Sequence, residues 1–168
     1  MLIPVFVSCP SVLNDRQETS RRIIMDELQL FGLEARAVGR SDYPIDFPLR
    51  EVHLLARRCA GGLILGFEYF RADGGIWKPD TAESRRAAGT VPFPTPWNQM
   101  EAGILFCLGL PLLVFREGEV SGGIFDNGVS DAFIQNMPPP DSSPALKASL
   151  HEVFGRWQAR VRQNYYTI

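Results

Sequence analysis

An acidic residue stands where the periodicity of a helix calls for an apolar one. Glu101 follows Trp97 by four residues and precedes Leu105 by four, intervals that place these side chains on one face of a helix. A carboxylate among apolar neighbours is costly unless it is paired or protonated, and either outcome shifts its pKa. Glu101 is therefore the first candidate for a catalytic carboxylate at a ligand cleft, with Trp97 one turn earlier at the rim.

The alternative for Glu101 is structural, an acid that caps a loop or pairs with an arginine such as Arg40. Arg40 itself is a candidate for binding a ligand. Ser8 could hydrogen-bond a ribose or a phosphate, or cap its own loop. No GxSxG motif surrounds it and no histidine is placed to activate it, so we exclude a nucleophilic serine. Cys9 could be a reactive thiol or a small packing residue.

The sequence contains no motif that would bind a metal or a resident cofactor. The three cysteines are widely separated and form no CxxC or Cys/His pattern with His53 or His151, so no metal site can be assembled. Neither GxGxxG nor GxxxxGK[ST] is present, which leaves no dinucleotide fingerprint and no phosphate-binding loop of that type. We expect no metal and no cofactor.

The composition is that of one soluble domain over residues 1–168. The chain has 168 residues, a net charge of −2 and a hydrophobic content of 45%, enough for a sizeable core. It has no basic tract, so a nucleic-acid polymer is not an expected partner. No apolar run approaches the roughly 20 residues that span a bilayer, so no membrane association is expected. An odd, scattered set of cysteines fits a reducing cytoplasm.

Short apolar runs alternate with helical periodicities along the chain. Continuous apolar runs indicate buried strands, and stripes with capping signals indicate helices. The first helix has Asp15 and Glu18 as its expected capping box, and the Glu101 helix has Thr95 as its N-cap. The expected strands lie over 2–7, 33–38, 63–67 and 110–115, with a further short one near 133–134, and the expected helices lie near 15–31, 49–59, 96–108 and 146–161.

This alternation predicts an α/β fold, a flavodoxin-like three-layer sandwich with a parallel sheet of four or five strands in the order 2-1-3-4-5. Such sheets bind ligands beyond the carboxyl ends of their strands where the strand order reverses, here between strands one and three. The loops after these strands and the start of the Glu101 helix should meet there. The expected ligand-binding residues are Ser8, Cys9, Pro10, Arg40, Gly66, Phe67, Glu68, Tyr69, Trp97 and Asn98.

The stretch from Glu68 to Pro94 is mostly polar and rich in Gly, Pro and Arg, with Ile76-Trp77 as an apolar island. It is longer than a structural connection usually needs, which indicates a functional or mobile loop.

Three stretches carry a family resemblance. Val5-Phe6-Val7-Ser8 is similar to the first strand and terminal serine of Toll/interleukin-1 receptor (TIR) domains that cleave NAD. Trp97-Asn98-Gln99-Met100-Glu101 matches the TIR pattern Trp-x-x-x-Glu, in which the glutamate is catalytic. Residues 101–114 resemble the nucleoside 2-deoxyribosyltransferase pattern of a glutamate, small residues, a helix, Gly-x-Pro and a buried strand. The chain thus resembles a flavodoxin-like group of enzymes that act on N-glycosidic bonds.

The resemblance implies cleavage of the N-glycosidic bond of NAD or a related nucleotide, by hydrolysis or cyclisation, with Glu101 as the essential carboxylate. This group would stabilise positive charge on the ribose or capture it covalently. The aromatic residues Trp97, Phe67 or Tyr69 would stack on the leaving heterocycle, and Asn98 and Ser8 would bind ribose hydroxyls. The expected partner is a small nucleotide ligand.

The resemblance leaves alternatives. Phe93-Pro94-Thr95-Pro96 stands where deoxyribosyltransferases have a polar cluster, which favours the TIR-like branch over a nucleoside 2-deoxyribosyltransferase. A second alternative is a non-catalytic module that binds or sequesters a nucleotide signal. A third is self-association through helices and long loops, as the TIR likeness implies, which would make the protein a homo-oligomer.

Overall fold

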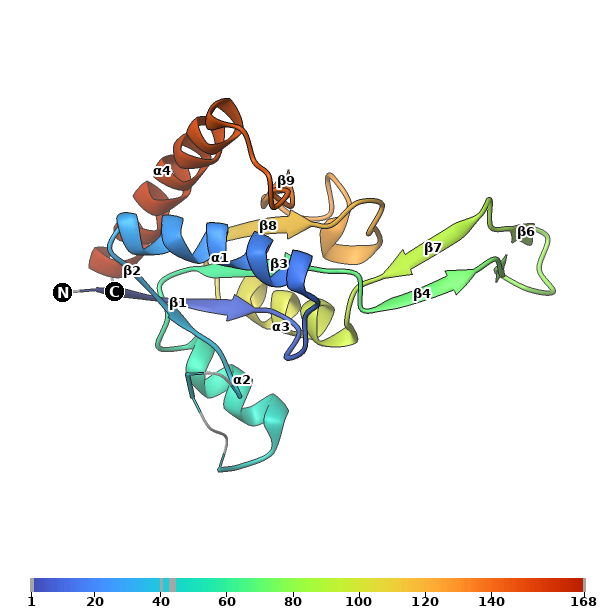
Figure 1. Ribbon diagram of the computed structural model, residues 1–168. Coiled ribbons are helices and arrows are strands. Elements are labelled where there is room, and N and C mark those ends of the chain that lie inside the picture. Colours follow the sequence, from blue (N-terminus) through green and yellow to red (C-terminus); the bar gives the residue numbers. More distant parts are fainter. Residues whose placement is uncertain (1, 40, 43–44, 168) are drawn as a thin grey trace.

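A five-stranded parallel sheet forms the centre of the computed structural model, which describes residues 2–39, 41–42 and 45–167 (Figure 1). The strands follow the order β2-β1-β3-β8-β9, and every neighbouring pair is parallel. This arrangement confirms the predicted α/β class and the order 2-1-3-4-5. The strands are β1 (Ile3–Ser8), β2 (Leu33–Arg36), β3 (Gly62–Gly66), β8 (Leu112–Arg116) and β9 (Phe133–Asn136).

Helices cover both faces of the sheet, so the molecule has three layers. On one face, α1 (Asp15–Leu30) and α4 (Pro144–Thr167) pack on Val5 and Val7 of β1. On the other, α2 (Pro48–Ala56) and α3 (Pro96–Cys107) pack on Phe6. Alternate residues of β1 thus enter two separate cores. Trp157 of α4 is fully buried in the first core, where its indole donates to the Pro111 carbonyl at 3.0 Å.

Capping residues fix where two helices begin. Asn14 caps α1, accepting from the Gln17 backbone while the Gln17 side chain accepts from the Asn14 backbone. The capping box is formed by two amide side chains and lies one residue before the predicted Asp15 and Glu18. Both acids fall within the first turn of α1 instead. Thr95 caps α3 as predicted, accepting from Trp97 N at 3.3 Å.

Residues 68–94 form a projecting arm. Strand β4 (Phe70–Asp73) pairs antiparallel with β7 (Thr90–Phe93), and near the tip β5 (Ile76–Trp77) pairs with β6 (Arg85–Arg86). Figure 1 shows the arm leaving the end of β3 and returning to the start of α3. The sequence suggested a loop here because these strands are short and rich in Gly and charge. Trp77 is 39% exposed, with the Arg85 guanidinium 5.8 Å from its ring centre.

Two further features complete the fold. A short 3₁₀ helix, η1 (Gly123–Phe125), follows β8 and places Ile124 and Phe125 in the second core. Among the described residues, no helix combines the length and apolarity needed to cross a bilayer.

Candidate active site

Glu101 lies in a cleft of about 450 Å³ beyond the carboxyl ends of β1 and β3. That volume falls in the range of small-molecule sites, and the position is where the strand order reverses. The cleft gathers the loop after β1, the start of α2, the base of the arm and the first turns of α3. Its lining residues are Cys9, Pro10, Ser11, Val12, Val38, Pro48, Val52, Tyr69, Thr95, Trp97 and Glu101.

Burial raises the pKa of Glu101 from 4.5 to about 7, because the surrounding protein disfavours the charged carboxylate. A hydrogen bond from Ser8 opposes this effect, since it stabilises the charged form. No arginine or lysine is among the causes of the shift. Near neutral pH the carboxyl can therefore exist in either protonation state, which is the property that acid–base and nucleophilic catalysis require.

A buried hydrogen-bond chain holds the Glu101 carboxyl. Asn98 donates from Nδ2 to Ser8 Oγ at 2.7 Å and to the Leu65 carbonyl of β3 at 3.4 Å. The Ser8 hydroxyl accepts from Asn98, so its own hydrogen is free to point at the carboxylate. Ser8 is 1% exposed and Asn98 0%. These two side chains thus support Glu101 from behind, and the expected contacts between them and ribose hydroxyls stay a prediction.

The buried stripe of α3 lies one residue away from the predicted one. Its buried residues are Asn98, Ala102 and Leu105, whereas Trp97 is 39% exposed and Glu101 lies between these extremes. A Cβ on Gly62 of β3 would lie 2.9 Å from Leu105 Cδ1, so α3 packs closely on the sheet with Ala102 and Leu105 facing it and Glu101 at the edge of the stripe. The carboxyl therefore meets the cleft instead of the core, with Trp97 one turn away on the same wall.

The other predicted binding residues divide into two groups. Cys9, Pro10 and Tyr69 line the cleft. Gly66 and Phe67 do not: both are buried in the protein interior, and a Cβ on Gly66 would lie 2.2 Å from Phe125 Cε1. Arg40 falls outside the described residues.

Glu68 takes part in a polar network beside the cleft, at the base of the arm. Its backbone N–H donates to Glu117 Oε2 at 2.7 Å, and the buried Gln17 side chain donates to the same oxygen at 2.8 Å and to the Glu68 carbonyl at 3.2 Å. The network ties α1 and the end of β8 to the start of the arm. Sequence reasoning missed Gln17 and Glu117, since neither belongs to a recognisable motif.

Sequence reasoning also missed several wall residues of the cleft, which are Ser11, Val12, Val38, Pro48, Val52 and Thr95. Val52 and Thr95 carried only helix signals, Val38 carried only a strand signal, and Val12 carried none. The position of Ser11 directly after Pro10, in the loop that follows β1, was the one signal that could have found it.

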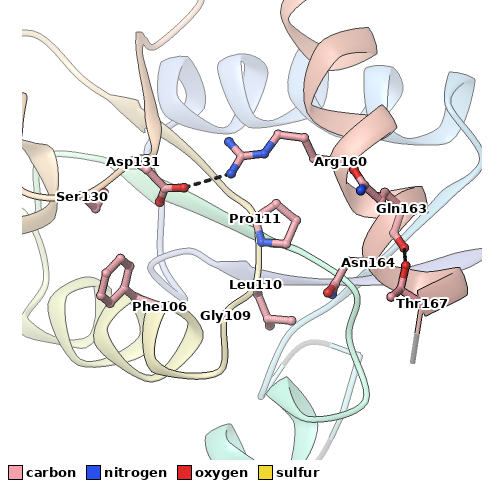
Figure 2. Close-up of a pocket in the computed structure, with 10 residues that line it drawn as sticks. All are labelled: Phe106, Gly109, Leu110, Pro111, Ser130, Asp131, Arg160, Gln163, Asn164 and Thr167. Atoms are coloured by element: carbon pink, nitrogen blue, oxygen red, sulfur yellow. Dashed lines mark hydrogen bonds and ion pairs between the residues drawn. The ribbon is translucent and has the colours of Figure 1, made fainter.

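A larger hollow of about 660 Å³ lies at the opposite end of the sheet, beside Pro111 and the last turns of α4 (Figure 2). Arg160 Nη2 and Asp131 Oδ2 form an ion pair of 2.9 Å across it, so its charges are already matched. Its carboxyl, Asp131, is exposed and paired with an arginine, unlike the partly buried Glu101, and we assign the hollow no chemistry. Among the described residues, no group of three His, Cys, Asp or Glu side chains could hold a metal ion.

Comparison with known proteins bears on the fold. No family model matches the chain, and no curated protein matches it. A solved structure of the CMP N-glycosidase BcmB from Clostridium botulinum has a TM-score of 0.50 at 11% identity, over 92% of this chain and 98% of that one. At this identity the likeness shows a shared fold, which is flavodoxin-like.

Two further solved structures are more distant. A flavodiiron core from Synechocystis sp. gives a TM-score of 0.47 at 10% identity, over 97% of this chain and 36% of that one. A diflavin flavoprotein from Nostoc sp. gives 0.44 at 16% identity, over 97% and 96% of the two chains.

Proposed function

We propose that this protein cleaves the N-glycosidic bond of a small nucleotide, with Glu101 as the essential carboxylate. The observation that carries the proposal is a carboxyl whose pKa is raised to about 7 by burial, in a cleft beside an exposed tryptophan face. Its position at the reversal of strand order supports it, as does the flavodoxin-like fold that the chain shares with a CMP N-glycosidase.

The cleft suits the charge that develops during this reaction. When the bond between C1′ and the ring nitrogen breaks, its electron pair leaves with the base and positive charge builds on the sugar. An ionised Glu101 beside C1′ would stabilise that charge or capture C1′ covalently. Water then supplies the hydroxyl of the free sugar. Its remaining proton passes to the leaving base of CMP, which departs as an anion, and is released to solvent when the leaving base is the neutral nicotinamide of NAD. Because Glu101 is poorly hydrated, its attraction to the cationic sugar is strong.

The remaining residues of the wall have binding roles in this proposal. Trp97 and Tyr69 present aromatic surface at the cleft, against which the leaving heterocycle would stack. Ser8 and Asn98 would position the carboxyl, because they are buried behind it. NAD is the substrate that the TIR resemblance favours, and a pyrimidine nucleotide is the one suggested by the CMP N-glycosidase.

Turnover of purified protein tests the proposal. The protein is incubated with NAD or with CMP, and release of nicotinamide or cytosine is followed by chromatography. Glu101→Gln keeps the size of the side chain but removes the charge, so we expect turnover to fall at least about 10³-fold. Glu152→Gln, an exposed position on α4, is the matched control and should retain full activity.

The two failures differ in meaning. Equal turnover by Glu101→Gln and the parent would remove Glu101 from the reaction. Tight binding of intact nucleotide by the parent, with no product from any nucleotide offered, would replace the enzyme by a nucleotide-binding module.

A further inference from the structure

The arm has an unpaired strand edge. In the part of the chain that the structure describes, β4 and β7 form a two-stranded sheet with no third strand, and Figure 1 shows the arm extending away from the helices and the central sheet. An isolated two-stranded hairpin is only marginally stable in water. The network of Gln17, Glu68 and Glu117 anchors the base of the arm, but it does not reach β4 itself.

The two edges of the arm differ. Pro92 of β7 lies opposite Arg71 of β4 and has no N–H to donate, so the neighbouring pairs, Ala72 with Val91 and Phe70 with Phe93, must carry the ladder between the strands. The hydrogen bond from Tyr69 N to Phe93 O at 2.9 Å agrees with this pattern, because it shows that the Phe93 carbonyl faces β4. The peptide groups of Arg71 and Asp73 therefore face outward. The outer edge of β7 is closed by its proline, while that of β4 is open.

The open edge of β4 is complementary to itself. If two copies of β4 lie antiparallel with Ala72 at the two-fold axis, Arg71 of each copy stands opposite the partner's Asp73. Residues directly opposite in antiparallel strands share a face, so both pairs would bring opposite charges together. Arg71 and Asp73 are exposed, and their present partners, Glu68 and Thr90, lie within the arm. The small Ala72 suits the close approach at the axis.

The apolar face of the arm also favours a second copy. Phe70, Ala72, Val91 and Phe93 lie on one face of the β4–β7 pair, with the Phe70 and Phe93 rings 6.3 Å apart. In the symmetric arrangement the two faces become one continuous apolar surface across four strands. Three or more strands with an apolar face are what a small sheet needs for stability.

We infer that two copies of this protein pair through their β4 edges, in antiparallel register about Ala72, to form a four-stranded sheet. Tyr69, which lines the cleft, immediately precedes β4. Pairing would therefore fix the arm side of the cleft in each copy. The inference rests on the arm alone and does not depend on the proposed reaction.

Charge reversal tests the register. The protein is studied by sedimentation equilibrium as the parent, as Arg71→Asp, as Asp73→Arg, and as an equimolar mixture of the two variants. In each variant alone, both inter-strand pairs carry like charges, so we expect the dimer to weaken by at least about tenfold. In the mixture, one chain offers two acids and the other two arginines. Both pairs are then attractive, and heterodimers should form with at least parental affinity.

The experiment measures self-association and not turnover, so its result is independent of the proposed reaction. A parent that stays monomeric up to its solubility limit overturns the inference and indicates that a different partner pairs with the β4 edge. So does either variant dimerising as tightly as the parent. Two monomeric variants that fail to associate when mixed overturn the register. Glu68→Gln, which removes the partner of Arg71 within the arm, is the control and should dimerise like the parent.

Discussion

At the scale of single residues, the ionisation of Glu101 sets the pH range of the proposed reaction. In the proposed reaction the carboxylate is the active form, and the pKa of Glu101 is about 7. We therefore expect kcat/KM to rise with pH through a limb centred near 7 and to level off above it. If Glu101 acted instead as a proton donor, the same limb would fall with rising pH. A pH–rate profile of the parent from pH 5 to about 9 distinguishes the two roles.

The same pKa makes Glu101 a destabilising residue at high pH. Below about 4.5 the carboxyl is protonated in both the folded and unfolded chains, so its burial has no charge cost. Between about 4.5 and 7 the unfolded chain loses its proton first, and stability falls as pH rises. We expect Glu101→Gln to raise the free energy of unfolding by up to roughly 3 kcal/mol at pH 8. Urea unfolding at pH 8 and pH 4.5 checks this, and an equal effect at both values would contradict it.

Ser8 offers a separate test of the site. Because its hydrogen bond lowers the pKa of Glu101, Ser8→Ala should move that pKa further upward. The measurement is an NMR titration of the glutamate carboxyl carbons. Ser20→Ala, which also removes a buried hydroxyl but from α1, should leave the titration unchanged. A Glu101 titration in Ser8→Ala that matches the parent would show that the hydroxyl does not contact the carboxylate.

At the scale of elements, Gly66 is needed where β3 meets η1. A Cβ there would lie 2.2 Å from the Phe125 ring, so we expect Gly66→Ala to destabilise the protein by about 1–3 kcal/mol. Gly103 on α3 has open space around its Cβ position, and Gly103→Ala should be neutral or stabilising by about 0.5–1 kcal/mol. Thermal unfolding of the two variants checks the pair. Equal stabilities would show that the Phe125 ring moves aside freely.

The central elements could be predicted because their signals are local. Continuous apolar runs marked β1, β3 and β8, and an apolar stripe from Leu146 to Val161 marked α4. The members of that stripe buried in the structure are Leu150, Phe154, Trp157 and Val161, whereas Leu146 is 40% exposed. The arm could not be predicted in the same way. Its strands bury almost nothing, so the alternation that identifies a half-buried strand is weak. Exposed aromatic residues beside charges are typical of loops as well.

The candidate site was predictable in part for a related reason. Glu101, Trp97 and the loop after β1 follow from helix spacing and from the general geometry of parallel sheets. The burial of Asn98 did not follow, because periodicity alone could not settle which of two adjacent stripes on α3 faces the sheet. That choice depends on how Ala102 and Leu105 pack in the second core, which is a tertiary property. The bond from Asn98 to Ser8 Oγ depends on the same orientation and did not follow either.

At the scale of the whole molecule, the tip of the arm and the three-layer body pack separately. The tip of the arm packs on itself and not on the cores. We therefore expect replacement of residues 73–90 by Asn-Gly, a two-residue hairpin turn that would join the hydrogen-bonded pair Ala72 and Val91, to shift the thermal midpoint by less than about 3 °C. Calorimetry checks this. A large loss of stability would show that the tip supports the body.

The three tryptophans of the chain occupy three different environments. Trp157 is sealed in the core, Trp97 stands at the cleft and Trp77 lies on the arm. Indole emission depends on local polarity, so intrinsic tryptophan fluorescence can report on each of these environments. With Trp77→Phe, quenching by an added nucleotide would report occupancy beside Glu101. With Trp97→Phe, a spectral shift on raising the protein concentration would report contact between arms, against the constant background of Trp157.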